Sequence, residues 1–202
     1  MGQAKARPTQ FSFLALMNEE LKQLYEADRQ EHANVPPNNT PEYKALRERD
    51  RRRRQRAAEL IVADQLRMAE DHYHAAKLFQ HGDTPEDAWN AHTLALKSAE
   101  LGYRPARWLT AAAYDRWLMY QGKSQKYGTQ YVSDGKRHRL WDVEPATTDA
   151  DRAEWDVPPL AEQLHKAEEA TRHHPPLPIV SDDAPQWLKD AIKRWERESE
   201  LR

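Results

Sequence analysis

The sequence predicts a mainly α-helical protein, a helical bundle or array of helical hairpins with a small β-hairpin or irregular insertion near residues 127–143. Two observations support this prediction. Apolar residues share one face in most of the expected helices, and Pro or Gly marks several helix ends. In the expected insertion, the pair Asp134-Gly135 separates two short segments, which is typical of a hairpin turn.

Residues that start and stop helices give the order of the expected elements. Thr9 and Thr40 are candidate N-caps, and Gly82 and Gly122 are candidate helix ends. Pro and Gly are absent from 42 to 81, so we expect one long helix there. The expected helices cover about residues 10–30, 42–80, 85–102, 105–122, 160–172 and 185–202, with a short helical turn over 148–155.

A chain of 202 residues is long enough for one domain with terminal appendages. We expect the main helical domain over residues 41–172, preceded by an N-terminal helix and linker over 1–40. Residues 173–202 are predicted to form a Pro-rich linker and a C-terminal amphipathic helix with Trp187 and Trp195 on its apolar face. That face docks on the domain or on a partner, and the sequence leaves both open.

Composition excludes several classes of protein. The net charge of -2 gives no global attraction to nucleic acid or to a membrane surface. The chain has no cysteine, which excludes disulfides and thiolate chemistry. No apolar stretch approaches the roughly 20 residues needed to span a bilayer. We therefore expect a cytoplasmic protein with no membrane association.

Basic residues are concentrated between Arg47 and Arg56. Acidic residues, among them Glu48 and Asp50, are interspersed in this run, and aromatic residues are absent from it. The run is therefore predicted to be the solvated face of the long helix, and nucleic-acid binding is not expected.

The most informative stretch joins an apolar helix to a polar loop. Ala106 to Gln121 reads as an apolar helix that contains the charged pair Asp115-Arg116, and the loop after Gly122 is crowded with amides and hydroxyls. Burying such groups costs free energy unless each finds a partner. Either the fold uses them internally or a ligand does, and the sequence leaves this choice open.

A polar stripe on the expected long helix also has two interpretations. Its members recur at spacings of three and four: Asp64, Arg67, Asp71, His74, Leu78 and His81. In the first interpretation the stripe faces water while the opposite side faces the core. In the second it faces a pocket built with the later loop, where Asp64 and Arg67 form an oriented pair.

The spacing of the nine histidines does not favour a metal site. No His-Glu-x-x-His motif is present, and of Asp71, His74 and His81 only two lie close together on a helix. A site would need His92 or Asp115 from another helix. We therefore expect no metal ion and no cofactor.

Several segments resemble a family of bacterial proteins, common in actinobacteria, that has no assigned activity. The matching segments are Asp64-Gln-x-Arg67, Ala75 to Gly82, Trp108 to Leu118, Gly122 to Gln130, and Thr148 to Leu160. The resemblance covers about residues 60–162, and the Gln-x-Tyr-Gly-Thr-Gln element is specific. It implies that the following residues form one shared site or a buried polar network: Asp64, Gln65, Arg67, Gln80, His81, Asp115, Arg116, Gln125, Tyr127, Gly128, Thr129, Gln130 and Arg152.

The leading functional hypothesis is a pocket that binds a small polar or anionic ligand. Its candidate ligand-binding residues are Asp64, Arg67, Gln80, Arg116, Gln125, Tyr127, Thr129, Gln130 and Arg152. His81 and Asp115 are the catalytic candidates, for acid–base chemistry of a hydrolase or transferase type, because a buried aspartate beside an arginine would have a shifted pKa. The alternative is a non-catalytic interaction or adaptor protein in which these residues are structural. In that case the C-terminal helix docks a protein partner or a second copy of the chain.

Overall fold

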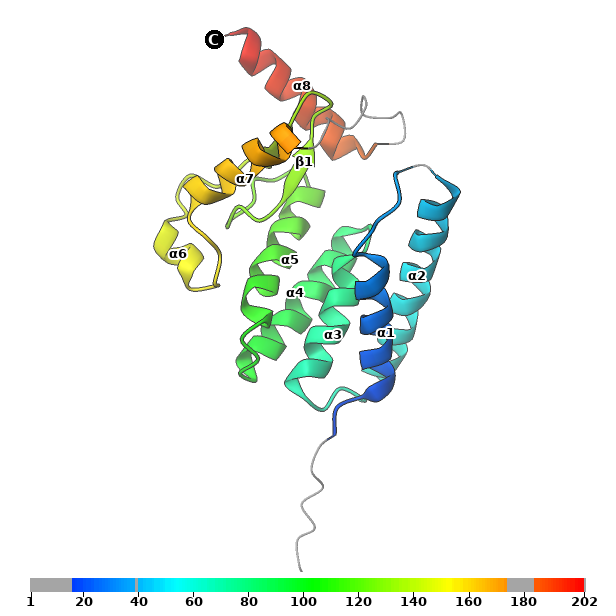
Figure 1. The fold of residues 1–202 in the computed structure, drawn as a ribbon. Coiled ribbons are helices and arrows are strands. Elements are labelled where there is room, and N and C mark those ends of the chain that lie inside the picture. Colours follow the sequence, from blue (N-terminus) through cyan, green and yellow to red (C-terminus); the bar gives the residue numbers. More distant parts are fainter. Residues whose placement is uncertain (1–15, 39, 174–183, 202) are drawn as a thin grey trace, which may run out of the picture.

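The structure is a computed structural model that describes residues 16–38, 40–173 and 184–201. Within these ranges the chain is mainly helical with one two-stranded antiparallel sheet, which confirms the predicted fold class. Its elements are α1 (Glu19–Glu31), α2 (Pro41–Val62), α3 (Ala69–Gln80), α4 (Pro85–Glu100), α5 (Ala106–Tyr120), β1 (Tyr131–Ser133), β2 (His138–Leu140), α6 (Asp149–Ala153), α7 (Leu160–His173) and α8 (Gln186–Glu200). Figure 1 shows α1 to α5 side by side, with β1 and α8 beyond one end of α5 and α6 beside α5 on the side away from α1 and α2.

Helix α3 is the centre of the bundle, because it contacts α1, α2, α4 and α5. The main core cluster contains Leu21, Ala57, Leu60, Ala75, Leu78, Phe79, Ala91 and Ala113, drawn from all five helices. Small alanines in α3, α4 and α5 let these helices approach closely. Leu21 belongs to the same cluster as α2 and α3, so α1 packs as part of this core. The domain boundary near residue 40 stays a prediction.

The expected single helix over 42–80 is wrong, because α2 ends at Val62 and α3 begins at Ala69. Asp64 adopts the left-handed conformation with φ of 52°, which aspartate tolerates better than most residues. The Gln65 N–H then donates to the Leu60 carbonyl at 2.9 Å and the Asp64 N–H to that of Ile61 at 3.0 Å, a Schellman ending. No Gly or Pro marks this break.

The central position of α3 also overturns the solvated interpretation of the polar stripe. Asp71, His74 and Leu78 are buried, whereas Val62, assigned to the core side, is 88% exposed. Because the helix is interrupted after Val62, Asp64 and Arg67 lie in the connection while Asp71, His74 and Leu78 lie in α3, and the two groups do not share one helix face. A helix packed on several sides has no wide solvated face to offer.

The first helix begins later than expected. The prediction started it near residue 10 with Thr9 as the cap; residues 1–15 lie outside the described residues. In the described part α1 begins at Glu19, and Asn18 caps it by accepting a hydrogen bond from the Leu21 N–H at 2.9 Å.

The arginine run is wrongly predicted as wholly solvated, since Arg53 and Arg54 are buried. Arg53 Nη2 lies 2.5 Å from Glu31 Oε2 in α1, and Arg54 Nη2 lies 3.6 Å from Asp83 Oδ2. Carboxylates on neighbouring elements therefore pair with guanidinium groups that the sequence alone would place in water. Arg51 and Arg52 do face solvent, as expected.

The second half of the chain builds a smaller cluster around the hairpin. Strands β1 and β2 pair in the register Val132 with Arg139, and Gly135 in the turn has a φ of 87°, which favours glycine. Helix α8 packs its apolar face on this region in a cluster of Met119, Tyr120, Val132, Trp141, Trp187, Leu188, Ala191, Ile192 and Trp195. The sequence left open whether the apolar face of α8 packs on the domain or on a partner, and in the structure it packs on the domain.

Candidate functional site

Asp115 holds the loop that follows α5. Its carboxylate is fully buried and accepts four hydrogen bonds. The Lys126 and Tyr127 N–H groups donate to Oδ1 at 2.8 and 2.9 Å, and the Thr129 N–H and hydroxyl donate to Oδ2 at 3.0 and 2.8 Å. Burial raises the pKa of this carboxyl, and the four hydrogen bonds act in the opposite direction. Loop donors therefore occupy both oxygens of this catalytic candidate.

Two glutamines close the same loop on itself. The Gln130 N–H donates to Gln125 Oε1 at 2.8 Å, while Gln125 Nε2 donates to the carbonyls of Gln130 and Trp141 at 3.1 and 2.8 Å. Gln130 Nε2 donates to the Ala112 carbonyl of α5 at 2.9 Å. Gly128 has a φ of 87°, a conformation that requires glycine in practice, and it turns the loop back towards α5.

Arg116 and Asp115 are adjacent in sequence but have different partners. Arg116 Nε donates to Gln130 Oε1 at 2.9 Å, and Nη1 donates to the carbonyl of Gln80 at the end of α3. Burial lowers the pKa of Arg116. Arg116 therefore connects the loop to the residue just before His81.

Arg152 fixes the segment opposite the loop. Its side chain is 2% exposed, and Nε donates to the Tyr127 carbonyl at 3.0 Å. Its Nη1 donates to the Thr147 carbonyl and to Asp149 Oδ1, both at 3.0 Å. We call Asp115, Arg116, Gln125, Gln130 and Arg152 the polar frame, because their bonds go mainly to main-chain groups of the segments around them.

Asp64 and Arg67 lie apart from the polar frame. Arg67 Nη1 is 3.1 Å from Asp64 Oδ2, as the paired interpretation expected, but the two side chains are 53% and 86% exposed. They lie in the short connection between α2 and α3, where this pair faces solvent. An exposed pair of this kind contributes little to stability.

A groove of about 660 Å³ lies beside the polar frame, between α5 and the segment from 144 to 151. It is lined by Tyr114, Leu118, Lys123, Ser124, Lys126, Glu144, Ala146, Thr147 and Asp151. Along the loop, Lys123, Ser124 and Lys126 are exposed whereas Gln125 and Tyr127 are buried. The polar frame thus holds the inner side of the loop while the outer side forms one wall of the groove.

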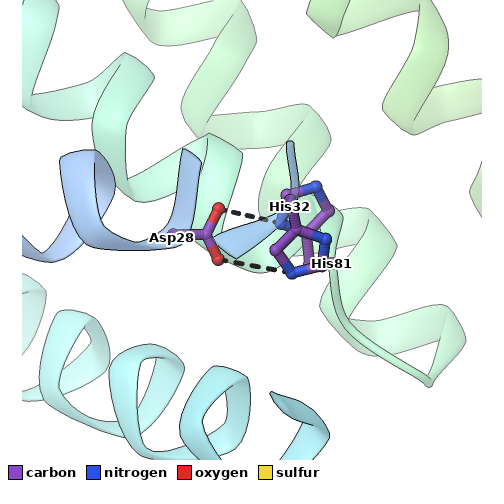
Figure 2. A group of neighbouring side chains, drawn as sticks. All are labelled: Asp28, His32 and His81. Atoms are coloured by element: carbon purple, nitrogen blue, oxygen red, sulfur yellow. Dashed lines mark ion pairs between the residues drawn. The ribbon is translucent and has the colours of Figure 1, made fainter. Parts of the chain in front are cut away.

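His81 lies in a separate cluster with two residues from the N-terminal part of the chain. Figure 2 shows the carboxylate of Asp28, from α1, directed at the stacked rings of His32 and His81. His81 Nδ1 is 2.9 Å from Asp28 Oδ2, and His32 Nε2 is 3.8 Å from Asp28 Oδ1. The centroids of the two imidazole rings are 3.7 Å apart. We call these three residues the acid–histidine centre.

Further charges surround the acid–histidine centre. Asp50 Oδ1 lies 3.1 Å from His32 Nε2, and Asp50 is also paired with Arg47 and Arg53 of its own helix. Burial raises the pKa of Asp50, but the hydrogen bond with His32 and the nearby positive charges outweigh it and hold this pKa below its ordinary value. Burial lowers the pKa of His81, which favours the neutral imidazole.

The structure divides the predicted site residues among three places: the polar frame with Tyr127 and Thr129, the exposed pair Asp64 and Arg67, and the acid–histidine centre with His81. Gln80 touches the frame through its carbonyl. Sequence reasoning missed Asp28 and His32. Their spacing of four residues, which puts them on one face of a helix, was the available signal.

Comparison with known proteins adds no relative: no protein-family model, no curated protein and no solved structure matches this chain. The resemblance to an actinobacterial family therefore stays a prediction. A search of the helices in the described residues finds none that is both long and apolar enough to cross a membrane.

Three buried or half-buried histidines predict a pH dependence of stability. In the folded chain, partial or full burial lowers the pKa of His74, His81 and His92 below the ordinary value of 6.5. Below this pH the unfolded chain binds more protons than the folded one, so the free energy of unfolding falls as the pH is lowered. A tenfold difference in proton affinity between the folded and unfolded chain corresponds to about 1.4 kcal/mol. Urea denaturation from neutral pH to about pH 5 measures the slope.

Two histidine variants show whether these histidines cause the change in the free energy of unfolding with pH. His92→Gln removes one half-buried histidine and is expected to reduce the dependence of stability on pH, while His165→Gln replaces an exposed histidine and serves as the control. A stability that rises on acidification over this range would contradict the expectation.

Proposed function

We propose that this protein binds a small polar ligand with an anionic group in the groove beside the polar frame. The groove supports this proposal because Lys123 and Lys126 line it together with the ring of Tyr114. Lys123 Nζ donates to Gln121 Oε1 at 3.0 Å and Lys126 Nζ lies 5.2 Å from the centroid of the Tyr127 ring. Among the described residues no carboxylate lies within ion-pair distance of either ammonium, although the charge of Lys126 interacts with that of Asp151 across the groove.

The opposite wall suggests which ligand the groove favours. Glu144 and Asp151 offer carboxylate oxygens there, and Tyr114 and Leu118 offer apolar surface. A phosphorylated sugar matches this lining: its phosphate faces the lysines, its hydroxyls donate to the carboxylates, and its ring packs on tyrosine. The proposal concerns binding and assigns no reaction to Asp115 or His81.

In this proposal the polar frame positions both walls without contacting the ligand. Asp115 and Gln125 hold the loop that carries the lysines, and Arg152 holds Thr147 opposite. The Glu144 N–H donates to the Gln125 carbonyl at 2.8 Å, which joins the two walls. A pocket with walls fixed in this way loses less conformational entropy when a ligand binds.

Thermal-shift and calorimetric titration with sugar phosphates and nucleoside monophosphates tests the proposal. At least one compound is expected to bind, and Lys123→Gln combined with Lys126→Gln is expected to weaken it about tenfold or more, since two charge-assisted bonds are lost. Lys44→Gln, at an exposed lysine of α2, is the matched control. A panel without any binder, or equal affinity of the double variant and the wild type, would overturn the proposal.

A further inference from the structure

Asp28 differs from the other buried aspartates of the bundle. Asp71 and Asp115 are both fully buried, and each carboxylate accepts hydrogen bonds from several main-chain N–H groups. Asp28 is 1% exposed, yet neither of its oxygens accepts a hydrogen bond. A buried carboxylate without such bonds is costly unless a cation compensates it.

The contact between Asp28 and His81 has the distance of a hydrogen bond but not its direction. Asp28 Oδ2 and His81 Nδ1 are 2.9 Å apart, and both atoms are buried without a hydrogen-bond partner of acceptable geometry. Two atoms that bind the same metal ion lie close together without hydrogen-bond geometry, because the lone pair of each is directed at the ion and not at the other atom.

The three side chains also have the separations that a metal ion requires. One ligand atom from each lies within 4.8 Å of the other two. Around a tetrahedral zinc ion, with bonds of about 2.0 to 2.2 Å, neighbouring ligand atoms are about 3.3 Å apart. Asp28 Oδ2 lies 2.9 Å from His81 Nδ1, and Asp28 Oδ1 lies 3.8 Å from His32 Nε2, so one carboxylate oxygen faces each imidazole at a separation near this value.

We propose that Asp28, His32 and His81 bind a divalent transition-metal ion of the zinc type. Two imidazole nitrogens and one carboxylate suit zinc, cobalt or iron(II), whereas magnesium and calcium prefer oxygen ligands only. Three protein ligands leave a further position at the ion. His32 and His81 are 16% and 20% exposed, so the three residues lie near the surface of the bundle although the facing atoms of Asp28 and His81 are buried.

Charged groups surround the proposed site. Metal ions of the zinc type bind the neutral form of the imidazole ring. His32 Nε2 also lies 3.1 Å from Asp50 Oδ1, and an ion bound at this nitrogen would replace that hydrogen bond. Two cations compete for Asp28. Arg53 Nη1 lies 3.9 Å from Asp28 Oδ1 and is also paired with Glu31 and Asp50, and the charge of Lys77 acts on both Asp28 and His81. The competing explanation is that Asp28 merely forms an ion pair with a protonated histidine.

Titration of the full, tag-free, chelator-treated protein with zinc chloride tests the proposal. We expect one equivalent to bind and to raise the melting temperature, because an ion that binds only the folded state stabilises it. Cobalt(II) should bind at the same place and give visible ligand-field absorption. Asp28→Asn, His32→Gln and His81→Gln should each weaken zinc binding by about tenfold or more, with circular dichroism to confirm folding.

The chain offers a matched control for adventitious binding. His165 and Glu169 form an exposed histidine–carboxylate pair on one helix, with Nδ1 and Oε2 3.7 Å apart, so they resemble Asp28 and His32 without the buried third ligand. His165→Gln should bind zinc like the wild type. Absence of stoichiometric zinc binding, or centre variants that bind as the wild type does, would overturn the proposal. So would loss of binding in His165→Gln, because the ion would then lie on the surface.

Discussion

Asp115→Asn is expected to lower the free energy of unfolding by about 3 to 5 kcal/mol. The substitution keeps the shape of the side chain but replaces one oxygen by an amide that cannot accept a hydrogen bond. If that amide takes the place of Oδ2, it faces the Thr129 N–H and hydroxyl; if it takes the place of Oδ1, it faces the N–H groups of Lys126 and Tyr127. Two buried donors lose their acceptor in either case. Urea denaturation measures the loss.

The control for this prediction is Asp151→Asn. Asp151 Oδ2 also accepts an N–H and a hydroxyl hydrogen bond, both from Thr148 at 2.7 Å, but at an exposed helix start. Its replacement is expected to cost about 1 kcal/mol, as for a helix cap. Equal losses in the two variants would show that burial of the Asp115 network contributes little.

Trp141→Ala is expected to cost about 3 to 5 kcal/mol and to detach α8. The Trp141 ring is 1% exposed and contacts the rings of Trp187 and Trp195 edge-on, with centroids 5.4 Å apart in both pairs. Its Nε1 donates to the Lys123 carbonyl at 2.7 Å. The variant leaves a cavity at the surface on which α8 docks. Urea denaturation and near-UV circular dichroism report the loss of stability and of tryptophan packing.

Two comparisons separate packing from the hydrogen bond. Trp141→Phe keeps an aromatic ring without the N–H, so an intermediate loss is expected. Trp108→Ala removes a tryptophan that is 42% exposed, and we expect it to cost about 1 kcal/mol or less. A Trp141→Ala protein as stable as Trp108→Ala would mean that α8 does not depend on this ring.

Local signals in the sequence were sufficient for much of the fold. Helix α4 starts at Pro85 as predicted, with the Thr84 hydroxyl accepting a hydrogen bond from the Asp87 N–H at 3.0 Å, and α5 ends at Tyr120 just before Gly122. Each of these boundaries depends on residues within one helical turn. The break at Asp64 was not predictable in this way, because its left-handed conformation is one that aspartate only sometimes adopts.

The candidate sites depended on packing between distant segments and were less predictable. The sequence identified the polar groups around Asp115 and Gln130 as needing partners, but whether loop donors or a ligand supply them depends on side-chain directions. His81 was a candidate without its partners, since its contact with Asp28 requires α1 to pack on α3. Arg53 was assigned to water for the same reason, because Glu31 approaches it from another helix.

The alternation of buried and exposed residues in the loop after α5 bears on how such a protein diversifies. Gln125 and Tyr127 are committed to the interior, whereas Lys123, Ser124 and Lys126 project from the same backbone into the groove. Substitutions at these three positions alter what the groove contacts without disturbing the hydrogen bonds that hold the loop. If the groove binds a ligand as proposed, a duplicated copy of this chain can acquire a new ligand preference at little risk to folding.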